Sequence, residues 1–286
     1  VISLNSFFQS MKPRVMSLVI FTCVVGLLIA PNQVDFLTAA LSLIAVTFGA
    51  GAAGALNMWY ESDLDALMKR TCLRPIPMGK ISRNQALVFG ITTSFASVIA
   101  LYFFSNLLSA IMLSITILFY VVVYTIWLKQ RTPQNIVIGG AAGAFPPIIG
   151  WSIATGNITL EPIFLFLIIF FWTPSHFWAL SLYKTEDYAN AKIPMLPVVS
   201  GIKTTKINIF VYSMILFFIS IAPYFFGYFG LTYFISSLLL GSYYVYLCYR
   251  LLTDESEVKK IAKKIFVYSI LYLFLIFTII LIDNIL

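Results

Sequence analysis

The sequence predicts an all-α, polytopic membrane protein, a bundle of about nine transmembrane helices. Of its 286 residues, 60% are hydrophobic and only 10% are charged, and the mean hydropathy is +0.95. An ordinary soluble domain carries about 25% charged residues, so these charges are too few to cover a water-facing surface. Lipid must surround most of the chain, which leaves a helical bundle or a closed barrel.

Long apolar runs favour the bundle. A barrel would show short segments that alternate between apolar and polar residues. Here each run approaches the ~20 residues that a helix needs to cross the hydrocarbon core, and none contains Lys, Arg, Asp or Glu. The predicted spans are residues 15–30, 36–56, 86–104, 107–128, 136–153, 163–182, 207–226, 231–249 and 265–282.

The charged residues indicate how these helices are oriented. With nine spans the loops alternate sides, and all 18 basic residues then fall on one side. The other side holds only Asp35, Glu161 and Asp283. The positive-inside rule makes the basic side cytoplasmic, with the N-terminus inside and the C-terminus outside. The net charge of +7 therefore reports topology, and we expect no nucleic-acid partner.

Two cytoplasmic loops, residues 57–85 and 183–206, are longer than the others. Each opens with acidic residues, continues with basic ones and contains Ile-Pro-Met, at residues 76–78 and 193–195. We expect a single membrane-embedded domain over residues 1–286, with an internal repeat that relates helices 1–4 to helices 5–8. Coincidence is the alternative explanation of so short a match.

Glycine and proline interrupt the fifth predicted helix. The residues concerned are Gly139, Gly140, Gly143, Pro146 and Pro147. Such residues kink a helix or let neighbouring helices approach closely.

The first long loop opens with a row of oxygen-bearing side chains. Asn57, Glu61, Asp65 and Lys69 are spaced by four, so they share one face if the second helix continues beyond the membrane, with Asp63 on the other face. Clustered carboxylates repel unless a cation offsets them. Two carboxylates and an amide suit Mg²⁺ together with phosphate oxygens. A solvated helix end with an Asp65–Lys69 ion pair is the alternative.

The second long loop supplies Asp187 as a further expected metal ligand, with Glu186 beside it. Asn57, Glu61, Asp65 and Asp187 are thus the predicted catalytic, Mg²⁺-binding residues. Basic side chains near them suit phosphate oxygens, although positive-inside placement explains any single one equally well. The candidates for diphosphate binding are Lys69, Arg70, Arg74, Lys129, Lys184 and Lys192.

This combination of residues predicts a prenyl transfer from a diphosphate. A diphosphate departs readily only when its charge is neutralised, which Mg²⁺ and Lys or Arg side chains accomplish. An allylic diphosphate then yields a stabilised carbocation, which needs a dry pocket because water would quench it. A bundle in lipid provides such a pocket.

His176 is the only histidine and lies within the sixth predicted span. Ionisable residues inside a membrane are functional candidates. His176 precedes Asp187 by eleven residues, about 16 Å along an unbroken helix, where an acceptor would bind below the charged site. Ligation of haem iron or contact with an acceptor is one interpretation of His176, and a hydrogen bond between helices is an equally good one.

Six separated segments, in one order, resemble the UbiA superfamily of intramembrane prenyltransferases, and within it the haem O synthase branch. Asn57-x3-Glu61-x3-Asp65 is similar to the first acidic motif of the superfamily, although Asp usually stands where this chain has Glu61. The segments are residues 12–16, 57–60, 69–77, 132–140, 174–180 and 187–197.

The resemblance implies a Mg²⁺-dependent enzyme that converts haem B, farnesyl diphosphate and water into haem O and diphosphate. It implies that Asn57, Glu61, Asp65 and Asp187 hold Mg²⁺ and diphosphate, and that His176 contacts haem. It further implies a bacterial inner (plasma) membrane location with the active site on the cytoplasmic side. The implied downstream partners are a haem A synthase or the assembly machinery of a terminal oxidase.

Two other functions remain open. One is a UbiA-type prenyltransferase that acts on an aromatic quinone precursor. The other is a transporter of an anionic substrate, which would carry ionisable groups deep within several helices.

Overall fold

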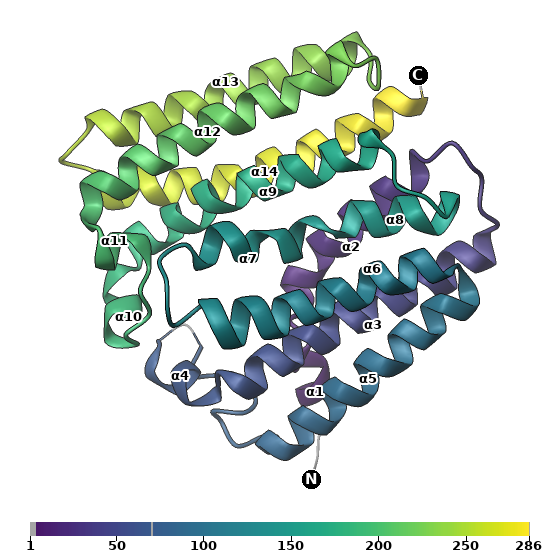
Figure 1. Cartoon of the computed structure of the whole chain (residues 1–286). Coiled ribbons are helices and arrows are strands. Elements are labelled where there is room, and N and C mark those ends of the chain that lie inside the picture. The colour runs from purple at the N-terminus through teal and green to yellow at the C-terminus, as the bar shows by residue number, and fades with distance from the viewer. Residues whose placement is uncertain (1–3, 70, 286) are drawn as a thin grey trace. The chain divides into compact units, whose positions relative to one another are not determined.

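The computed structural model describes residues 4–69 and 71–285, and every regular element within them is a helix (Figure 1). The elements fall into two compact units, Val1–Gln130 with Phe145–Ile158 (unit 1) and Arg131–Ala144 with Thr159–Leu286 (unit 2). Unit 1 contains α1 (Leu4–Ser10), α2 (Pro13–Leu28), α3 (Phe36–Tyr60), α4 (Ser62–Leu67), α5 (Arg83–Phe104), α6 (Leu107–Leu118), the π-helix η1 (Phe119–Leu128) and α8 (Pro146–Thr155). Unit 2 contains α7 (Asn135–Ala144), α9 (Leu160–Tyr183), α10 (Thr185–Asn190), α11 (Leu196–Val199), α12 (Gly201–Phe225), α13 (Leu231–Thr253) and α14 (Val258–Ile285).

The predicted membrane bundle is confirmed. Within the described residues, eight helical segments are long and apolar enough to cross a membrane. A ninth is present if α1 and α2, which meet at a bend of 58°, are counted as one span. The first predicted span is thus the weakest of the nine, because α2 alone has only 16 residues.

Polar caps at the helix starts explain several of the observed boundaries. Asp35 accepts a hydrogen bond from the Thr38 amide at 3.0 Å and begins α3. Ser82 and Gln85 form a reciprocal capping box at the start of α5. Each cap satisfies amide groups that have no partner within the helix.

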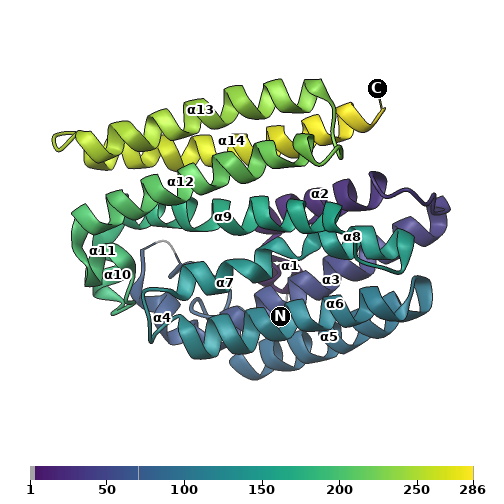
Figure 2. The same ribbon diagram turned by 45° about the horizontal axis from the view of Figure 1, so that its top comes forward.

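Each unit packs around its own long helices (Figure 2). In unit 1, α3 packs against α5 and α6, while α2 packs along α8. In unit 2, α9 packs against α7, α12 and α14, and α13 packs against α12 and α14. The fifth predicted helix is broken as its glycines and prolines indicate, because α7 ends at Ala144 and α8 begins at Pro146.

Glycine makes the contact between α2 and α8 possible. A Cβ atom on Gly150 would lie 1.9 Å from the carbonyl oxygen of Cys23, and one on Gly26 would lie 2.1 Å from the carbonyl oxygen of Pro147. Backbone atoms cannot move aside as a side-chain rotamer can, so only glycine allows the two helices to approach this closely.

Both units place a six-residue helix directly after a long one. In unit 1, Glu61 alone separates α3 from α4, and in unit 2, Lys184 alone separates α9 from α10. This shared arrangement is what an internal repeat would produce, and the repeat itself stays a prediction. The stretch from His176 to Asp187 is not an unbroken helix, since α9 ends at Tyr183.

The loop after α4 is pinned to the rest of unit 1 by a small apolar core. Ile76 and Ile81 from the loop are buried against Met58 of α3 and Ala86 of α5, and Trp59 packs against the same cluster. These contacts hold the loop against the end of α3, and Arg74 lies two residues before the first of them, Ile76.

Candidate functional site

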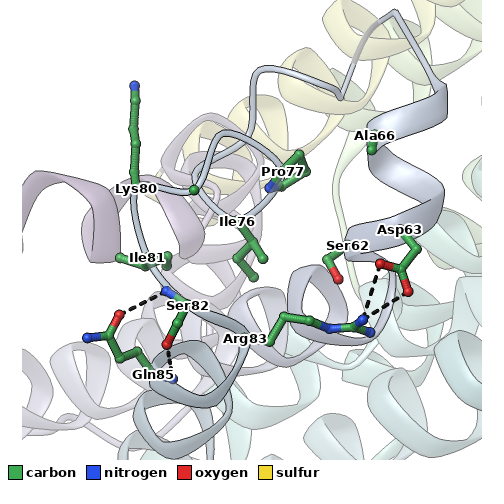
Figure 3. Close-up of a pocket in the computed structure, with 11 residues that line it drawn as sticks. Ser62, Asp63, Ala66, Ile76, Pro77, Lys80, Ile81, Ser82, Arg83 and Gln85 are labelled. Atoms are coloured by element: carbon green, nitrogen blue, oxygen red, sulfur yellow. Dashed lines mark hydrogen bonds and ion pairs between the residues drawn. The ribbon is translucent and has the colours of Figure 1, made fainter.

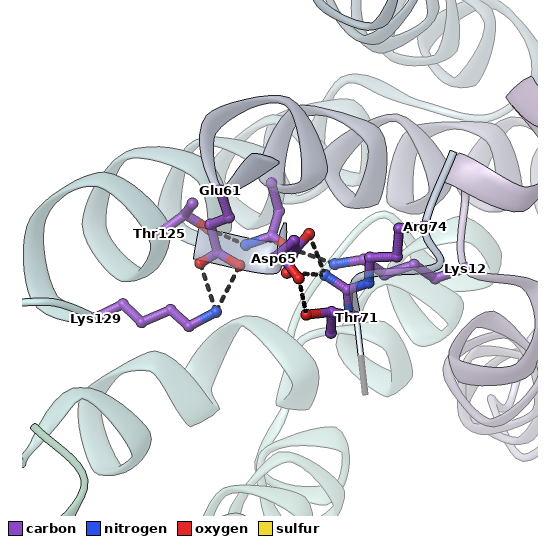
Figure 4. A network of polar contacts seen from close by, with 8 residues as sticks. Lys12, Glu61, Asp65, Thr71, Arg74, Thr125 and Lys129 are labelled. Carbon is purple, nitrogen blue, oxygen red and sulfur yellow. Dashed lines mark hydrogen bonds and ion pairs between the residues drawn. The ribbon is translucent and has the colours of Figure 1, made fainter. Parts of the chain in front are cut away.

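Asn57, Glu61 and Asp65 lie on one face where α3 leads into α4, as their spacing predicts, and each is only 2% exposed. Figure 4 shows Glu61 and Asp65 with the basic side chains that contact them. The amide of Glu61 donates to the carbonyl of Asn57 at 3.0 Å, and the amide of Asp65 donates to the carbonyl of Glu61 at 2.7 Å. These bonds keep helical register across the single-residue break, so the three side chains stay aligned.

Lys69 does not belong to this row. The helix α4 ends at Leu67, Met68 is extended, and Lys69 is exposed beyond it. The alternative interpretation, an Asp65–Lys69 ion pair, is wrong because Asp65 pairs with Arg74. Lys69 is absent from the row because α4 ends before it, so the helical spacing of four that aligns Asn57, Glu61 and Asp65 does not continue to residue 69. Arg70 lies outside the described residues.

Asp65 is held by an arginine from the pinned loop. Arg74 Nη1 donates to both carboxylate oxygens of Asp65, at 2.8 and 2.7 Å. The Thr71 hydroxyl donates to the backbone carbonyl of Asp65 at 2.9 Å and fastens the start of the loop to α4. Arg74, a predicted diphosphate ligand, thus contacts a predicted metal ligand directly.

Glu61 is paired in the same way. Lys129 Nζ lies 2.5 Å from Glu61 Oε1 and 2.6 Å from Oε2. Lys129 follows η1, a ten-residue π-helix, and its backbone amide donates to the carbonyl of Tyr124 five residues earlier, at 3.0 Å. π-Helical turns are rare and occur often at functional sites. Here the π-helix sets the position from which Lys129 reaches Glu61.

Asn57 connects to two residues that the sequence did not single out for the site. Its amide nitrogen donates to the Thr125 hydroxyl of η1 at 2.9 Å, and its amide oxygen accepts a hydrogen bond from Lys12 Nζ. Lys12 lies 45 positions before Asn57 in the chain. The only sequence signal was its place in the first segment of the family resemblance.

The whole cluster gathers three basic side chains and two carboxylates. Lys12, Arg74 and Lys129 oppose Glu61 and Asp65, so the formal charge is +1 when all three basic groups are protonated. Burial, followed by repulsion from Arg74, lowers the pKa of Lys12 to about 7. A cluster with this balance attracts an anion.

The donor set fits Mg²⁺ bound together with a phosphate compound. The amide oxygen of Asn57 and the carboxylates of Glu61 and Asp65 are hard oxygen ligands, and the adjacent cations suit phosphate oxygens. Within the described residues no three His, Cys, Asp or Glu side chains gather as a metal site by themselves. The amide and the phosphate oxygens would therefore have to complete the coordination.

Replacing Lys129 with Gln should destabilise the protein, because it leaves Glu61 charged and buried without its partner. Removing one member of a buried pair costs about 3–5 kcal/mol, less here because Lys129 is 18% exposed. Thermal unfolding of the purified protein in detergent should show a clear fall in Tm. The matched control, Lys80→Gln, changes an exposed lysine in the loop between α4 and α5 and should leave Tm within about 1 °C. Equal Tm values for the two variants would contradict the pairing.

Asp63 lies on the opposite, exposed face of α4, as predicted. It forms a surface ion pair with Arg83 at 2.9 Å. The two residues line a half-open cavity of about 750 Å³ together with Ser62, Lys80 and Gln85 (Figure 3). This cavity does not include the buried acids, so it is separate from the charged cluster.

The second long loop belongs to unit 2. Asp187 is half-buried in the first turn of α10, and Glu186 is exposed and pairs with Lys259 at 3.1 Å. Lys184 and Lys192 are exposed. The Asp187 carboxylate is thus available for a ligand. That Asp187 shares a metal ion with the acidic residues of the first loop stays a prediction.

His176 forms the hydrogen bond between helices that was one of its two interpretations. Its Nδ1 lies 2.6 Å from the hydroxyl of Ser269 on α14, and its side chain is 6% exposed. Trp172, one turn earlier on α9, donates from Nε1 to the carbonyl of Ser269 at 2.8 Å. The imidazole is therefore a structural link between α9 and α14, and its contact with an acceptor stays a prediction.

Comparisons with known proteins identify relatives over nearly the whole chain. The family model described as "UbiA prenyltransferase family" matches residues 19–270. Protoheme IX farnesyltransferase of Pelagibacter ubique (strain HTCC1062) is 63% identical over 289 residues, which cover 100% of this chain and 95% of that protein. Protoheme IX farnesyltransferase of Bartonella bacilliformis is 53% identical, covering 99% of this chain and 92% of that protein.

Solved structures share the fold. A structure of digeranylgeranylglyceryl phosphate synthase aligns with a TM-score of 0.82 at 21% identity, covering 99% of this chain and 98% of that one. A UbiA homologue from Archaeoglobus fulgidus bound to GPP and Mg²⁺ aligns with a TM-score of 0.68 at 16% identity, covering 96% and 99%. At these identities the likeness concerns the fold alone.

Proposed function

The chain belongs to the UbiA prenyltransferase family, and from this premise we propose that it transfers the farnesyl group of farnesyl diphosphate to a vinyl group of haem B. Addition of water completes the reaction and gives haem O and diphosphate. The observation that carries the proposal is the buried cluster at the end of α3. It combines oxygen ligands for a metal with cations for a diphosphate in one place.

The proposed reaction begins at the diphosphate. The bond between C1 of the farnesyl group and the bridging oxygen breaks, and its electron pair leaves with the diphosphate. Mg²⁺ held by Asn57, Glu61 and Asp65, with Asp187 from the second loop, would neutralise that charge. Lys12, Arg74 and Lys129 would turn from their present partners toward phosphate oxygens. The remaining candidates for phosphate contact are Lys69, Arg70, Lys184 and Lys192.

The farnesyl cation then accepts electrons from the haem vinyl group, and a carbon–carbon bond forms. The positive charge moves to the carbon attached to the porphyrin ring, where water adds and loses a proton to diphosphate. His176 would contact the haem acceptor. Apolar helices around the reacting groups exclude stray water, which would otherwise capture the farnesyl cation first.

The chain is a multi-pass membrane protein, and we propose the bacterial inner membrane as its location, with the site facing the cytoplasm. The support is the distribution of all 18 basic residues on one side of the predicted topology. In this topology the N-terminus would be inside and the C-terminus outside. A haem A synthase or the assembly machinery of a terminal oxidase would use the product.

The purified protein, supplied with haem B, farnesyl diphosphate and Mg²⁺, should produce a haem that is more hydrophobic than the substrate. Its mass should increase by one farnesyl group and one hydroxyl group, as measured by chromatography and mass spectrometry of the solvent extract. Chelation of Mg²⁺ with EDTA should stop the reaction, and added Mg²⁺ should restore it.

An aromatic quinone precursor, offered in parallel with haem B, is the control for acceptor identity. A prenylated quinone precursor together with unchanged haem would contradict the proposal and favour the other UbiA-type activity. A transporter is disfavoured because Glu61 and Asp65 lie together at one end of α3, rather than along several helices.

A further inference from the structure

The half-open cavity of about 750 Å³ on unit 1 is lined by charged and polar side chains that the proposed function does not use (Figure 3). Ser62 and Asp63 of α4 line it, together with Arg83 from the start of α5 and Lys80 from the loop between the two helices. The same loop is anchored in the small apolar core through Ile76 and Ile81, both of which also line the cavity. The cavity is therefore formed before any ligand enters it.

The side chain that indicates a ligand is Ser62. The residue is only 4% exposed, and its hydroxyl has no hydrogen-bond partner among the described residues. A buried polar group without a partner is destabilising, and alanine would occupy the same place without that cost. In Figure 3 the hydroxyl points toward the side chain of Arg83, at the edge of the cavity. This hydroxyl suits a partner that enters through the cavity.

The charged side chains of the cavity favour an anion. Arg83 Nη1 donates to the two carboxylate oxygens of Asp63, at 3.2 and 2.9 Å, and the two side chains are 48% and 84% exposed. Exposed pairs are weak, so Arg83 can exchange Asp63 for another anion. Lys80 is extended away from this pair and adds to the local charge without contacting it. Two cations and one carboxylate leave a formal charge of +1.

The start of α5 adds backbone donors. This helix has 22 residues, and its capping box satisfies the amides of Ser82 and Gln85. In the part of the chain that the structure describes, the amides of Arg83 and Asn84 have no acceptor. Free amides and the positive end of the helix dipole make the N-terminus of a long helix a favourable place for a phosphate group.

The cavity also lies at the end of a membrane span. The helix α5 is long and apolar enough to cross a membrane, and it begins at Arg83, which lines the cavity. The adjoining loop exposes two apolar side chains, Leu73 at 72% and Met78 at 49%. Apolar side chains next to cations are typical of a segment at a membrane surface, where basic residues attract the phosphates of lipid head groups.

We propose that this cavity binds a phosphate group, which the membrane offers as a phospholipid head group and the aqueous side offers as free phosphate. Arg83 turns from Asp63 to the phosphate, and the hydroxyl of Ser62 donates to one of its oxygens. The bound group then links α4, the loop and α5. Because Arg74 belongs to the same loop, occupancy stabilises the segment that supplies Arg74 to the charged cluster. Binding at this site does not depend on farnesyl transfer.

Native mass spectrometry of the full chain in lipid-free detergent tests the site. Phosphatidylglycerol is the probe, and diacylglycerol is the control that lacks a phosphate. Wild-type protein should retain phosphatidylglycerol and release diacylglycerol. Arg83→Gln and Ser62→Ala should each weaken the binding of phosphatidylglycerol by roughly 10-fold or more, because each removes a hydrogen bond to a charged group. Equal affinity of wild-type protein for the two lipids would overturn the proposal.

Two matched variants control for general effects of the substitutions. Ser42 of α3 is also fully buried, and its hydroxyl also has no partner among the described residues, but it does not line the cavity. Ser42→Ala and Ser62→Ala should both maintain or raise Tm in lipid-free detergent, which shows that both are folded. Only Ser62→Ala should lose lipid binding. Arg14→Gln changes an exposed arginine of α2 and is the control for Arg83→Gln.

Inorganic phosphate distinguishes the two sources. If phosphate alone raises the Tm of wild-type protein but not that of Ser62→Ala, the site takes free phosphate. If only phosphatidylglycerol does so, the site takes a lipid head group. Phosphate bound at the charged cluster would be unaffected by Ser62→Ala. Binding that is equal in wild-type protein, Ser62→Ala and Arg83→Gln would therefore overturn the proposal, as would the absence of binding with both probes.

Discussion

Replacing Asp65 with Asn is expected to lower turnover by about 10²- to 10³-fold while the protein remains folded in the membrane. The amide has the size of the carboxylate and still accepts a hydrogen bond from Arg74, so packing at the end of α3 is preserved. The negative charge is lost, however. The variant therefore lacks one charged ligand for Mg²⁺ and the ion pair between residue 65 and Arg74.

Asp63→Asn is the matched control for this experiment. It removes the same charge two residues away, but from an exposed position whose partner is Arg83 on the surface. Exposed pairs contribute about 0–1 kcal/mol to stability, so this variant should keep nearly full activity. Farnesyl transfer and Tm are to be measured for both variants. Full activity of Asp65→Asn would remove Asp65 from the metal site, and equal losses in both would assign the effect to general charge.

Replacing Gly150 with Ala is expected to cost about 3 kcal/mol or more of stability and to abolish a stable fold in detergent. The added methyl group would lie 1.9 Å from the carbonyl oxygen of Cys23 and 2.8 Å from the amide nitrogen of Leu27. Both are backbone atoms of α2, so the overlap can be relieved only by separating α2 from α8.

Gly143→Ala provides the control for helix propensity. A Cβ atom on Gly143 of α7 would meet nothing within 4 Å, and alanine favours a helix over glycine by up to about 1 kcal/mol. Gly143→Ala should therefore raise or maintain Tm, whereas Gly150→Ala should lower it sharply or prevent purification of monodisperse protein. A Gly150→Ala protein as stable as the wild type would show that α2 and α8 do not approach as closely as described.

Residues whose roles depend on local spacing could be predicted well. The apolar runs locate the spans because a helix must be about 20 residues long to cross the hydrocarbon core. The spacing of four places Asn57, Glu61 and Asp65 on one face, and Asp63 on the other. The same reasoning failed at Lys69, because periodicity does not reveal where a short helix such as α4 ends.

Pairings between residues far apart in the chain could not be predicted. Lys129 reaches Glu61 across 68 positions, and Lys12 reaches Asn57 across 45. No spacing rule connects such residues, since their meeting depends on how whole helices pack. The π-helix η1 adds a shift in register that a pattern based on 3.6 residues per turn does not anticipate.

Composition and periodicity were enough to predict a bundle of membrane helices with acidic and basic residues gathered at loop ends. Both follow directly from the lipid solvent and from the geometry of a helix. The packing of the helices settles which cation pairs with which carboxylate, why Gly150 and Gly26 must remain glycine, and that His176 is hydrogen-bonded to Ser269 of α14. Those outcomes depend on distances between segments that are remote in the chain, and such distances are set by packing.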